Sequence, residues 1–272
     1  MIEDVILAKD RRGISKLRNF LQENFCERAS KYIIKKSQRV MILTGFYVKG
    51  HCETDGPLGA LMLTKALRRL KSEVLLVSDD PCFGILKSFE EGVLEFPITS
   101  HEKSRRFAKE LVKEEKPSLI ISCERCGFSH DQRYYNARGE DITPFTAKLD
   151  YLFSFKETIG IGDFGNEIGM GNLSKKIENH LKIKPCITRC RHLVIASTSN
   201  WGCYGLISYL SILSSKNLLP SSREEEEMLE LLVQRGAVDG FSGLPETKVD
   251  GFSPDALREI LEELQSLVEE KI

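Results

Sequence analysis

The sequence carries almost no net charge and contains no long apolar run. Its 39 Lys and Arg residues balance 40 Asp and Glu residues, which leaves a formal net charge of -1. Dedicated nucleic-acid binders usually carry a basic domain or stripe, so this balance argues against that class. No apolar run approaches the roughly 18 residues of a membrane span, and the N-terminus lacks the apolar core of a secretory signal. These absences predict a soluble, cytoplasmic protein that binds neither nucleic acid nor membrane.

Flexible linkers and internal repeats are also missing. A chain of 272 residues with 41% hydrophobic residues can bury a full core. We therefore predict a single domain over residues 1–272, with a helical appendage over residues 1–37 and an α/β core over residues 38–272. The oligomeric state stays open at this stage, and a homo-oligomer is one alternative.

The eight cysteines do not suggest a disulfide framework. Cysteines in a chain without a secretion signal are usually thiols. One alternative is a tetrahedral zinc site formed by the pairs Cys123/Cys126 and Cys186/Cys190. Their spacing is looser than the usual zinc patterns, and Cys123 ends an apolar strand pattern in which a buried thiol is ordinary. We therefore expect all eight cysteines to be reduced and free of metal.

Six short apolar segments alternate with segments of helical spacing. Continuous apolar runs are typical of strands that are buried on both faces of a parallel sheet. The alternation predicts an α/β fold with a mostly parallel, doubly wound sheet and helices on both faces. In such sheets, ligands bind beyond the carboxyl ends of the strands. The predicted strands are 40–46, 73–79, 93–96, 118–124, 158–163 and 191–197.

The most unusual segment covers residues 159–172 and reads IGIGDFGNEIGMGN. Gly160, Gly162 and Gly165 match a dinucleotide fingerprint, but glycines also fall where the helix should open, and no acid follows about twenty residues on. We therefore expect no nucleotide cofactor there. The alternatives are a tight turn with solvated acids or a turn folded under a ligand. In the second case its backbone amides should face the ligand together with three side chains, namely Asp163, Asn166 and Glu167.

Two other polar segments also follow predicted strands. Gly45, at the end of the predicted strand, and Gly50, in the loop that follows, have the spacing of a phosphate loop. The lysine and hydroxyl residues of such a loop are missing, which argues against a nucleoside triphosphate. Asp55 is either the N-cap of the next helix or a site residue, whereas Glu53 has no capping position. After the strand at 118–124, Glu124 begins a long polar loop, which is either solvated or functional.

The three segments bring carboxylates, an amide and arginines to one end of one predicted sheet. Arginines in the polar loop are suited to a forked contact with a carboxylate. An oxygen-rich cluster of acids suits Mg²⁺ or Mn²⁺. It also suits a zwitterion, whose ammonium would contact the acids while its carboxylate contacts an arginine. The arginines of this loop are Arg125, Arg133 and Arg138.

Several motifs occur together in a familiar order. TGF, ETDGPLGA, ERCG, YYNARGEDIT, LDYLF, IGIGDFGNEIGMG, SNWGCYGL and GAVDG follow one another as in the C-terminal domains of the D-glutamate cyclase family. The sequence resembles that family from about Thr44 to Gly251, with Phe164 at a family glycine and Cys126 at a family proline. The resemblance implies a lyase that converts D-glutamate to 5-oxo-D-proline and water. In larger relatives this domain is joined to a second, hydro-lyase-like domain, which has no counterpart in this sequence.

The implied cyclisation requires a base for the α-ammonium and an acid or metal for the departing oxygen. Asp163 and Glu167 are the candidate base and acid, and Asn166 is the candidate donor to the oxyanion. The candidate ligands for Mn²⁺ or Mg²⁺ are Glu53, Asp55 and Asp163. The candidate substrate contacts are Glu124, Arg125, Arg138, Gly162 and Gly165.

Some roles stay open in the sequence. Asp239 and Asp250 either cap turns or close over the site. One rival class is a non-catalytic module that binds a small acid or a metal and is related to the cyclase. A second rival is metal-dependent phosphoryl or acyl chemistry on another small acid.

Overall fold

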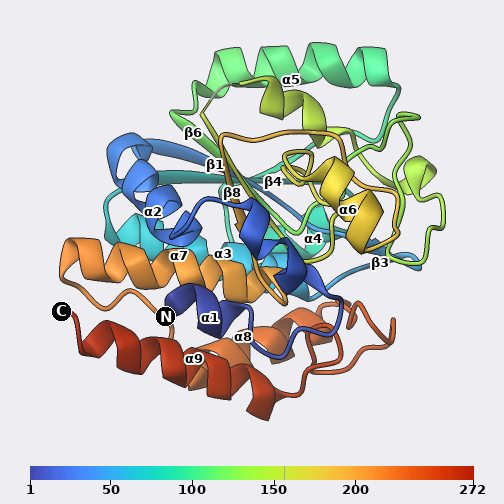
Figure 1. The fold of residues 1–272 in the computed structure, drawn as a ribbon. Helices are drawn as coiled ribbons and strands as arrows, with labels where there is room; N and C mark the ends of the chain where they lie inside the picture. Colours follow the sequence, from blue (N-terminus) through green and yellow to red (C-terminus); the bar gives the residue numbers. More distant parts are fainter. Residues whose placement is uncertain (156) are drawn as a thin grey trace.

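The structure is a computed structural model that describes residues 1–155 and 157–272. Its N-terminal part contains the helix α1 (Ile2–Ile6), the 3-10 helix η1 (Ile14–Phe20) and the helix α2 (Phe25–Lys36). Both α1 and α2 pack against α7 (Ser199–Ser214), and α2 also contacts the last strand of the sheet. The N-terminal helices therefore lie against the core along their length (Figure 1).

Six parallel strands form the central sheet in the order β5-β4-β1-β6-β7-β8. Each apolar segment predicted to be a strand contributes one of them, so the predicted α/β fold is confirmed. The chain order along the sheet reverses between β1 and β6, which is the switch point where sheets of this class form a crevice. The strands are β1 (Arg39–Thr44), β4 (Glu73–Ser78), β5 (Val93–Glu95), β6 (Leu119–Cys123), β7 (Thr158–Gly162) and β8 (His192–Ile195).

Side chains of the strands alternate between two apolar layers. In β1, Val40 and Ile42 join the larger core, whereas Met41 and Leu43 join the smaller one. This alternation follows from the period of two in an extended strand, and burial on both faces explains the continuous apolar runs. Figure 1 shows the helices that cover each face. The larger core lies under α3 (Asp55–Arg69) and α7, and the smaller one under α5 (His101–Glu115) and η3 (Leu149–Ser154).

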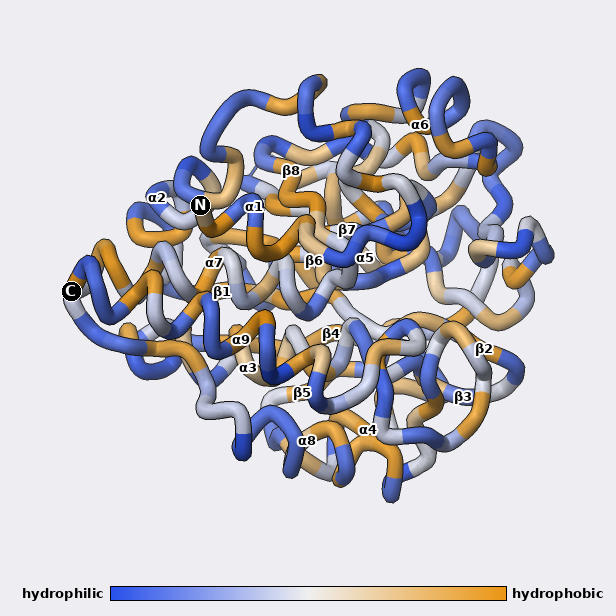
Figure 2. The backbone as a smooth tube through the Cα atoms, turned by 60° about the horizontal axis from the view of Figure 1, so that its bottom comes forward, coloured by the Kyte–Doolittle hydropathy of each residue, from blue (hydrophilic) through white to orange (hydrophobic). Residues whose placement is uncertain are grey.

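An outer helical layer lies beyond α3 and α7 (Figure 1). It contains α1, α8 (Ser222–Gln234) and α9 (Pro254–Glu269), and α9 buries one apolar stripe at helical spacing. Figure 2 shows β8 as an apolar segment in the interior, whereas many of the outer turns are hydrophilic. No helix in the described part of the chain is long and apolar enough to cross a membrane. The remaining helices are α4 (Cys82–Lys87), α6 (Ser174–His180) and the 3-10 helix η2 (Thr143–Phe145).

The segment after β1 differs from its prediction. β2 (Tyr47–Val48) and β3 (His51–Cys52) form an antiparallel hairpin where the sequence predicted a loop. The sequence did not reveal the hairpin, because strands of two residues are too short to show a periodic pattern. The hairpin brings Cys52 to the start of α4, where it forms a disulfide with Cys82. The prediction of eight free thiols is therefore wrong for this pair. The other six cysteines are free.

Candidate functional site

A cavity of about 280 Å³ opens where β1, β6 and β7 end, at the switch point of the sheet. Its walls include the residues that follow these strands, namely Phe46, Glu124 and Asp163. Because the strands are parallel neighbours, Gly45, Glu124 and Asp163 lie on one edge of the sheet, as the sequence predicts. The β2–β3 hairpin, the loop at 136–145 and the turn at 240–243 complete the walls.

Buried carboxyl groups dominate the cavity. Glu53, Glu124, Asp163 and Glu167 all line it, and all are buried. Burial raises the pKa of Glu53, Glu124 and Asp163 well above its usual range, and neighbouring acids raise it further. The pKa of Asp55, next to them, is raised to about 7 by burial and by the charge of Asp250. This excess of acids favours the entry of a cation, either a metal or an ammonium group.

One arginine from the N-terminal segment reaches into this cluster. Arg12 Nη1 donates to Asp163 Oδ1 at 2.6 Å, and Nη2 donates to Asp250 Oδ1 at 2.5 Å. Burial alone would lower the pKa of Arg12, but the charges of Asp163 and Asp250 raise it well above its usual value. Sequence analysis missed Arg12, because no local pattern in DRRG indicates a partner 151 residues away. The N-terminal segment is thus part of the site.

Each aspartate bound by Arg12 keeps a second oxygen without a hydrogen-bond partner among the described residues. These atoms, Asp163 Oδ2 and Asp250 Oδ2, are buried. Two groups of carboxylates have ligand oxygens within 4.8 Å of one another, and both include Asp163. An all-oxygen donor set of this kind fits Mg²⁺ or Mn²⁺. The groups are Asp55, Asp163 and Asp250, and Glu124, Asp163 and Glu167.

The glycine-rich turn is folded around its own acid. The amides of Phe164 and Gly165 donate to the Glu167 carboxylate at 3.0 and 2.7 Å, so they do not face the cavity as the sequence led us to expect. Gly165 has a φ of 129°, which favours glycine. A Cβ at Gly162 would approach Glu167 Oε2 to 2.7 Å. Neither glycine lines the cavity, so neither is placed as a substrate contact.

Asn166 also belongs to this turn and lines the cavity. Its Nδ2 donates to the carbonyl of Tyr135 at 2.9 Å, which anchors the turn to the polar loop. The Phe164 ring lines the cavity as well, and the Arg12 guanidinium lies 5.6 Å from the ring centroid. Phe164 therefore occupies space in the cavity beside Arg12.

Asp55 caps a helix other than its own. Its two carboxylate oxygens accept the amides of Ser199 and Asn200 at 2.8 and 2.6 Å, at the first turn of α7. Of the two alternatives for Asp55, the N-cap of α3 is ruled out, since Thr54 takes that position and Asp55 is the first residue of the helix. A carboxylate at a helix N-terminus satisfies amides that have no partner within the helix. Asp55 thus ties α3 to α7 beside the cavity.

Glu124 sits in an unusual backbone conformation directly after β6. Its φ of 43° lies in the left-handed region, which non-glycine residues rarely adopt. Its Oε2 accepts a hydrogen bond from Ser199 Oγ at 2.5 Å. Strained residues of this kind persist where the surroundings fix them and cluster at functional sites.

Arg125 points away from the cavity. Its guanidinium is buried and makes two parallel hydrogen bonds to the Asp79 carboxylate. It also donates to the carbonyls of Gly45 and Ala147 at 2.8 and 2.9 Å. The structure therefore does not bring Arg125 to the substrate position that was expected from sequence. This arginine instead fixes the backbone behind the cavity.

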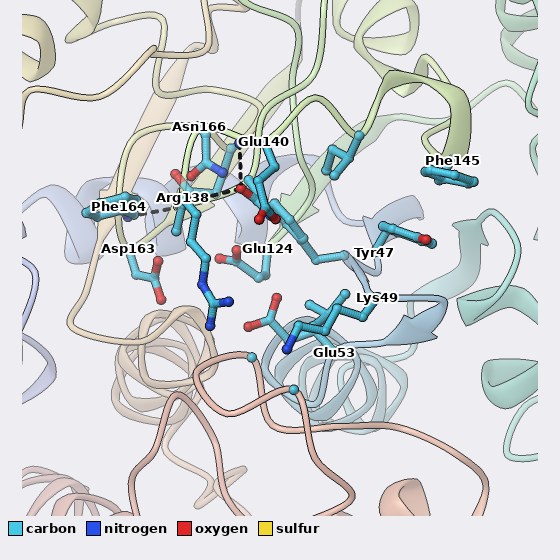
Figure 3. A pocket seen from close by; sticks show the side chains of 18 of the residues that line it. Tyr47, Lys49, Glu53, Glu124, Arg138, Glu140, Phe145, Asp163, Phe164 and Asn166 are labelled. Carbon is cyan, nitrogen blue, oxygen red and sulfur yellow. Dashed lines mark hydrogen bonds between the residues drawn. The ribbon is translucent and has the colours of Figure 1, made fainter.

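The rim of the cavity carries two exposed cations. Lys49 and Arg138 lie there, and Figure 3 shows their side chains beside the buried acids Glu53 and Glu124. Arg138 Nη2 donates to the carbonyl of Phe241 at 3.3 Å, which bridges the rim. Sequence analysis found Arg138 but missed Lys49. The rings of Tyr47 and Phe145 stack at the rim with centroids 4.6 Å apart.

The two C-terminal aspartates have different roles. Asp239 accepts the amides of Ser242 and Gly251 at 2.8 and 2.7 Å, so it caps a turn. Asp250 instead closes over the site through Arg12. Between them, Gly240 lines the cavity, and a Cβ there would collide with the Glu53 carboxylate.

The fold and the cavity define an α/β domain whose switch-point site is rich in carboxylates and is closed by both ends of the chain. The chain belongs to the family described as "D-glutamate cyclase-like, C-terminal", which matches residues 2–265 and confirms the resemblance found in the sequence. Human mitochondrial D-glutamate cyclase is 31% identical, over 80% of this chain and 44% of that protein. The chain thus spans less than half of that relative.

Two solved structures show remote similarity. An exopolyphosphatase-related protein from Bacteroides fragilis is 13% identical with a TM-score of 0.47, over 90% of this chain and 58% of that one. RecJ from Thermus thermophilus, solved with Mn²⁺, is 11% identical with a TM-score of 0.40, over 92% of this chain and 38% of that one. Similarity at this level says nothing about the chemistry of the site.

Proposed function

We propose that this protein is a lyase of the D-glutamate cyclase type, which converts D-glutamate to 5-oxo-D-proline and water. The observation that carries the proposal is the cavity itself, with buried acids inside and the cations Lys49 and Arg138 at its rim. A glutamate that enters with its ammonium inward would meet the acids, while a carboxylate would stay near a rim cation. Family membership and the human relative support the same reaction class.

Two acids are suited to the proton transfers. The free Oδ2 of Asp163 is placed to take the ammonium proton, so that the amine attacks the γ-carboxyl carbon. Glu124 favours its protonated form, because burial raises its pKa, and this form can give one proton to the departing oxygen. The second proton that the nitrogen loses as the ring closes goes to the same oxygen, which then leaves as water. Both oxygens of Glu167 already accept backbone amides, so we assign it to holding the turn. Asn166 remains the candidate donor to the oxyanion.

A divalent cation fits this proposal without being required by it. Asp163 and Asp250 would hold it through their free oxygens, with Asp55 or Glu124 as further ligands. Such an ion, when bound, polarises a carboxyl group as a Lewis acid. The choice between Mn²⁺ and Mg²⁺ is left to experiment.

The direct test is incubation of the pure protein with D-glutamate or L-glutamate, with and without Mn²⁺, followed by chiral detection of 5-oxoproline. We expect 5-oxo-D-proline from D-glutamate and much less product from L-glutamate. Asp163→Asn should abolish product formation. Failure to form product from either isomer, under conditions where the protein binds D-glutamate, would refute catalysis by this chain.

The rival function is a binding module that holds a small amino acid or a metal without turnover. It is favoured by one observation, which is that the buried oxygens Asp163 Oδ2 and Asp250 Oδ2 have no partner among the described residues and offer a binding site whether or not turnover follows. The same incubation separates the two functions. Saturable binding of D-glutamate without any 5-oxoproline identifies the module.

A further inference from the structure

We propose that Arg12 is the specificity-determining residue of the cavity and that it exchanges ion-pair partners with an incoming α-amino acid. In this exchange the ligand's ammonium replaces Arg12 on Asp163, and the ligand's α-carboxylate replaces Asp163 on Arg12. The inference rests on the proposed function insofar as it takes an amino acid as the ligand. It goes further by assigning the selection of a zwitterion to one residue of the N-terminal segment.

The position of Arg12 differs from that of the other cations of the cavity. Its side chain is 22% exposed and pairs with two acids whose side chains are 0% and 3% exposed. Lys49 and Arg138 are exposed at the rim, and neither forms an ion pair with an acid among the described residues. Within that part of the chain, Arg12 is the cation that neutralises Asp163. A ligand that approaches Asp163 therefore meets Arg12.

The charges make this exchange selective. An ammonium group without a carboxylate would free Arg12 from Asp163 and leave part of its guanidinium unpaired. A carboxylate without an ammonium would compete with Asp163 and leave that acid unpaired. Removing one partner of a buried ion pair is strongly unfavourable, whereas a zwitterion pairs both charges again. The cavity should therefore prefer α-amino acids to amines and to simple dicarboxylates.

The local structure allows the Arg12 side chain to release one hydrogen bond while it keeps the other. The Asp10 carboxylate accepts the amides of Arg12, Gly13 and Ser15 at 3.0, 2.7 and 2.9 Å, which fixes the backbone of this loop. The exchange is thus a movement of the Arg12 side chain. Its second hydrogen bond, to Asp250, can persist while the bond to Asp163 is released. Asp250 acts as the pivot of the exchange.

The test compares three ligands of similar length by calorimetry. D-glutamate carries an α-ammonium and an α-carboxylate, glutarate lacks the ammonium, and 4-aminobutyrate lacks the α-carboxylate. The wild-type protein should bind D-glutamate at least about tenfold more tightly than either analogue. Arg12→Gln should weaken D-glutamate binding about tenfold or more and bring it close to that of 4-aminobutyrate, because the site then gains nothing from the α-carboxylate.

Arg18→Gln is the matched control, since Arg18 lies in the same segment but pairs with Asp4 on the surface. It should keep the wild-type affinities and their order. Arg12→Lys retains the charge but cannot bind a carboxylate through a fork, so it should weaken D-glutamate binding while keeping the order of the ligands. This variant carries the test if Arg12→Gln fails to fold.

The outcomes separate this inference from the proposed reaction. Binding of D-glutamate that depends on Arg12 but gives no product refutes the reaction and leaves the exchange standing. Turnover of D-glutamate with the same affinities and ligand order in wild type, Arg12→Gln and Arg12→Lys refutes the exchange alone. A wild-type protein that binds all three ligands equally, or binds none of them, also overturns the exchange.

Discussion

A buried arginine and a half-buried one can be compared directly in this protein, namely Arg125 and Arg12. Arg125 faces one carboxylate, Asp79, and its guanidinium also donates to two backbone carbonyls. Arg12 lies between Asp163 and Asp250, and each of these acids keeps one oxygen without a partner in the described part of the chain. The first pair is balanced in charge, and both oxygens of Asp79 accept hydrogen bonds. The second is an unbalanced cluster.

The difference shows how the same chemistry serves structure in one place and binding in another. A buried carboxylate whose oxygens are all satisfied has nothing to offer a ligand. A buried carboxylate with a free oxygen beside other acids is costly to maintain, and a cation that enters relieves that cost. We therefore interpret the Arg125–Asp79 pair as structural and the cluster around Arg12 as the binding site.

The largest effect is expected from breaking the balanced pair. Arg125→Met would leave Asp79 buried without its partner, which typically destabilises a protein by about 3–5 kcal/mol. Unfolding in urea, followed by circular dichroism, measures this loss. The double variant Arg125→Met/Asp79→Leu should recover much of it, because no buried charge is left unpaired. A stable single variant would contradict the structural role.

The next largest effect concerns pH and the unbalanced cluster. The pKa of Asp55 is about 7 in the folded protein and 3.8 is its ordinary value, so protonation favours the folded state. The contribution of this group to the free energy of unfolding is fully present below about pH 4 and is lost as the pH rises towards about 7. The loss is on the order of 2–4 kcal/mol. Burial raises the pKa of Asp163 and Glu53 in the same direction.

Melting temperatures at several values between pH 4.5 and 7.5 test this dependence. We expect stability without ligand to fall across this range, and the fall should be smaller when D-glutamate or Mn²⁺ is bound. A melting temperature that rises steadily with pH would contradict this, because it would mean that ionising these acids in the folded protein costs little free energy.

Two conservative variants should move stability in opposite directions within the same turn. Glu167→Gln removes an acceptor for the amides of Phe164 or Gly165, so it should destabilise the protein by about 1–3 kcal/mol. Asp163→Asn removes a charge from a crowded cluster but keeps an oxygen that can accept from Arg12, and Arg12 also keeps its ion pair with Asp250. Stability should therefore stay equal or rise by up to about 1 kcal/mol while ligand binding is lost. Melting curves and calorimetry on both variants measure this contrast. If the two variants showed the same changes in stability and in ligand binding, Glu167 could not be assigned to holding the turn and Asp163 to binding the ligand.

The smallest effect is expected at an exposed ion pair. Arg18 and Asp4 are 42% and 56% exposed in their side chains. Exposed pairs contribute about 0–1 kcal/mol, so Arg18→Gln should change the free energy of unfolding by less than about 1 kcal/mol. If Arg18→Gln lowered the free energy of unfolding as much as Arg125→Met, burial would not determine how much these arginine ion pairs contribute to stability.

Much of the fold was predictable, because strands that are buried on both faces leave a continuous apolar signal. All six strands of the sheet follow from that signal. The β2–β3 hairpin and the disulfide from Cys52 to Cys82 do not, since strands of two residues have no period and a cysteine pair has no local signature. A disulfide such as this one depends on how segments that are distant in the sequence come together in the fold.

The site was predictable in its location but less so in its roles. Topology alone places Glu124 and Asp163 on one edge, because both follow adjacent parallel strands. Sequence does not say where a long side chain points, so Arg125 and Arg138 looked equivalent although only Arg138 reaches the cavity. Arg12 was missed for the same reason.

The bridge from Arg12 to Asp250 spans 238 residues, and this bears on how the protein is made. A ribosome releases Arg12 well before it releases Asp250. Until then, the nascent chain can assemble its central strands but cannot finish the acidic cavity. The cavity is therefore completed only after the last strand, β8, has been made, so a chain that stops before residue 250 would contain all six strands of the sheet and lack the partner that holds Arg12 over the site.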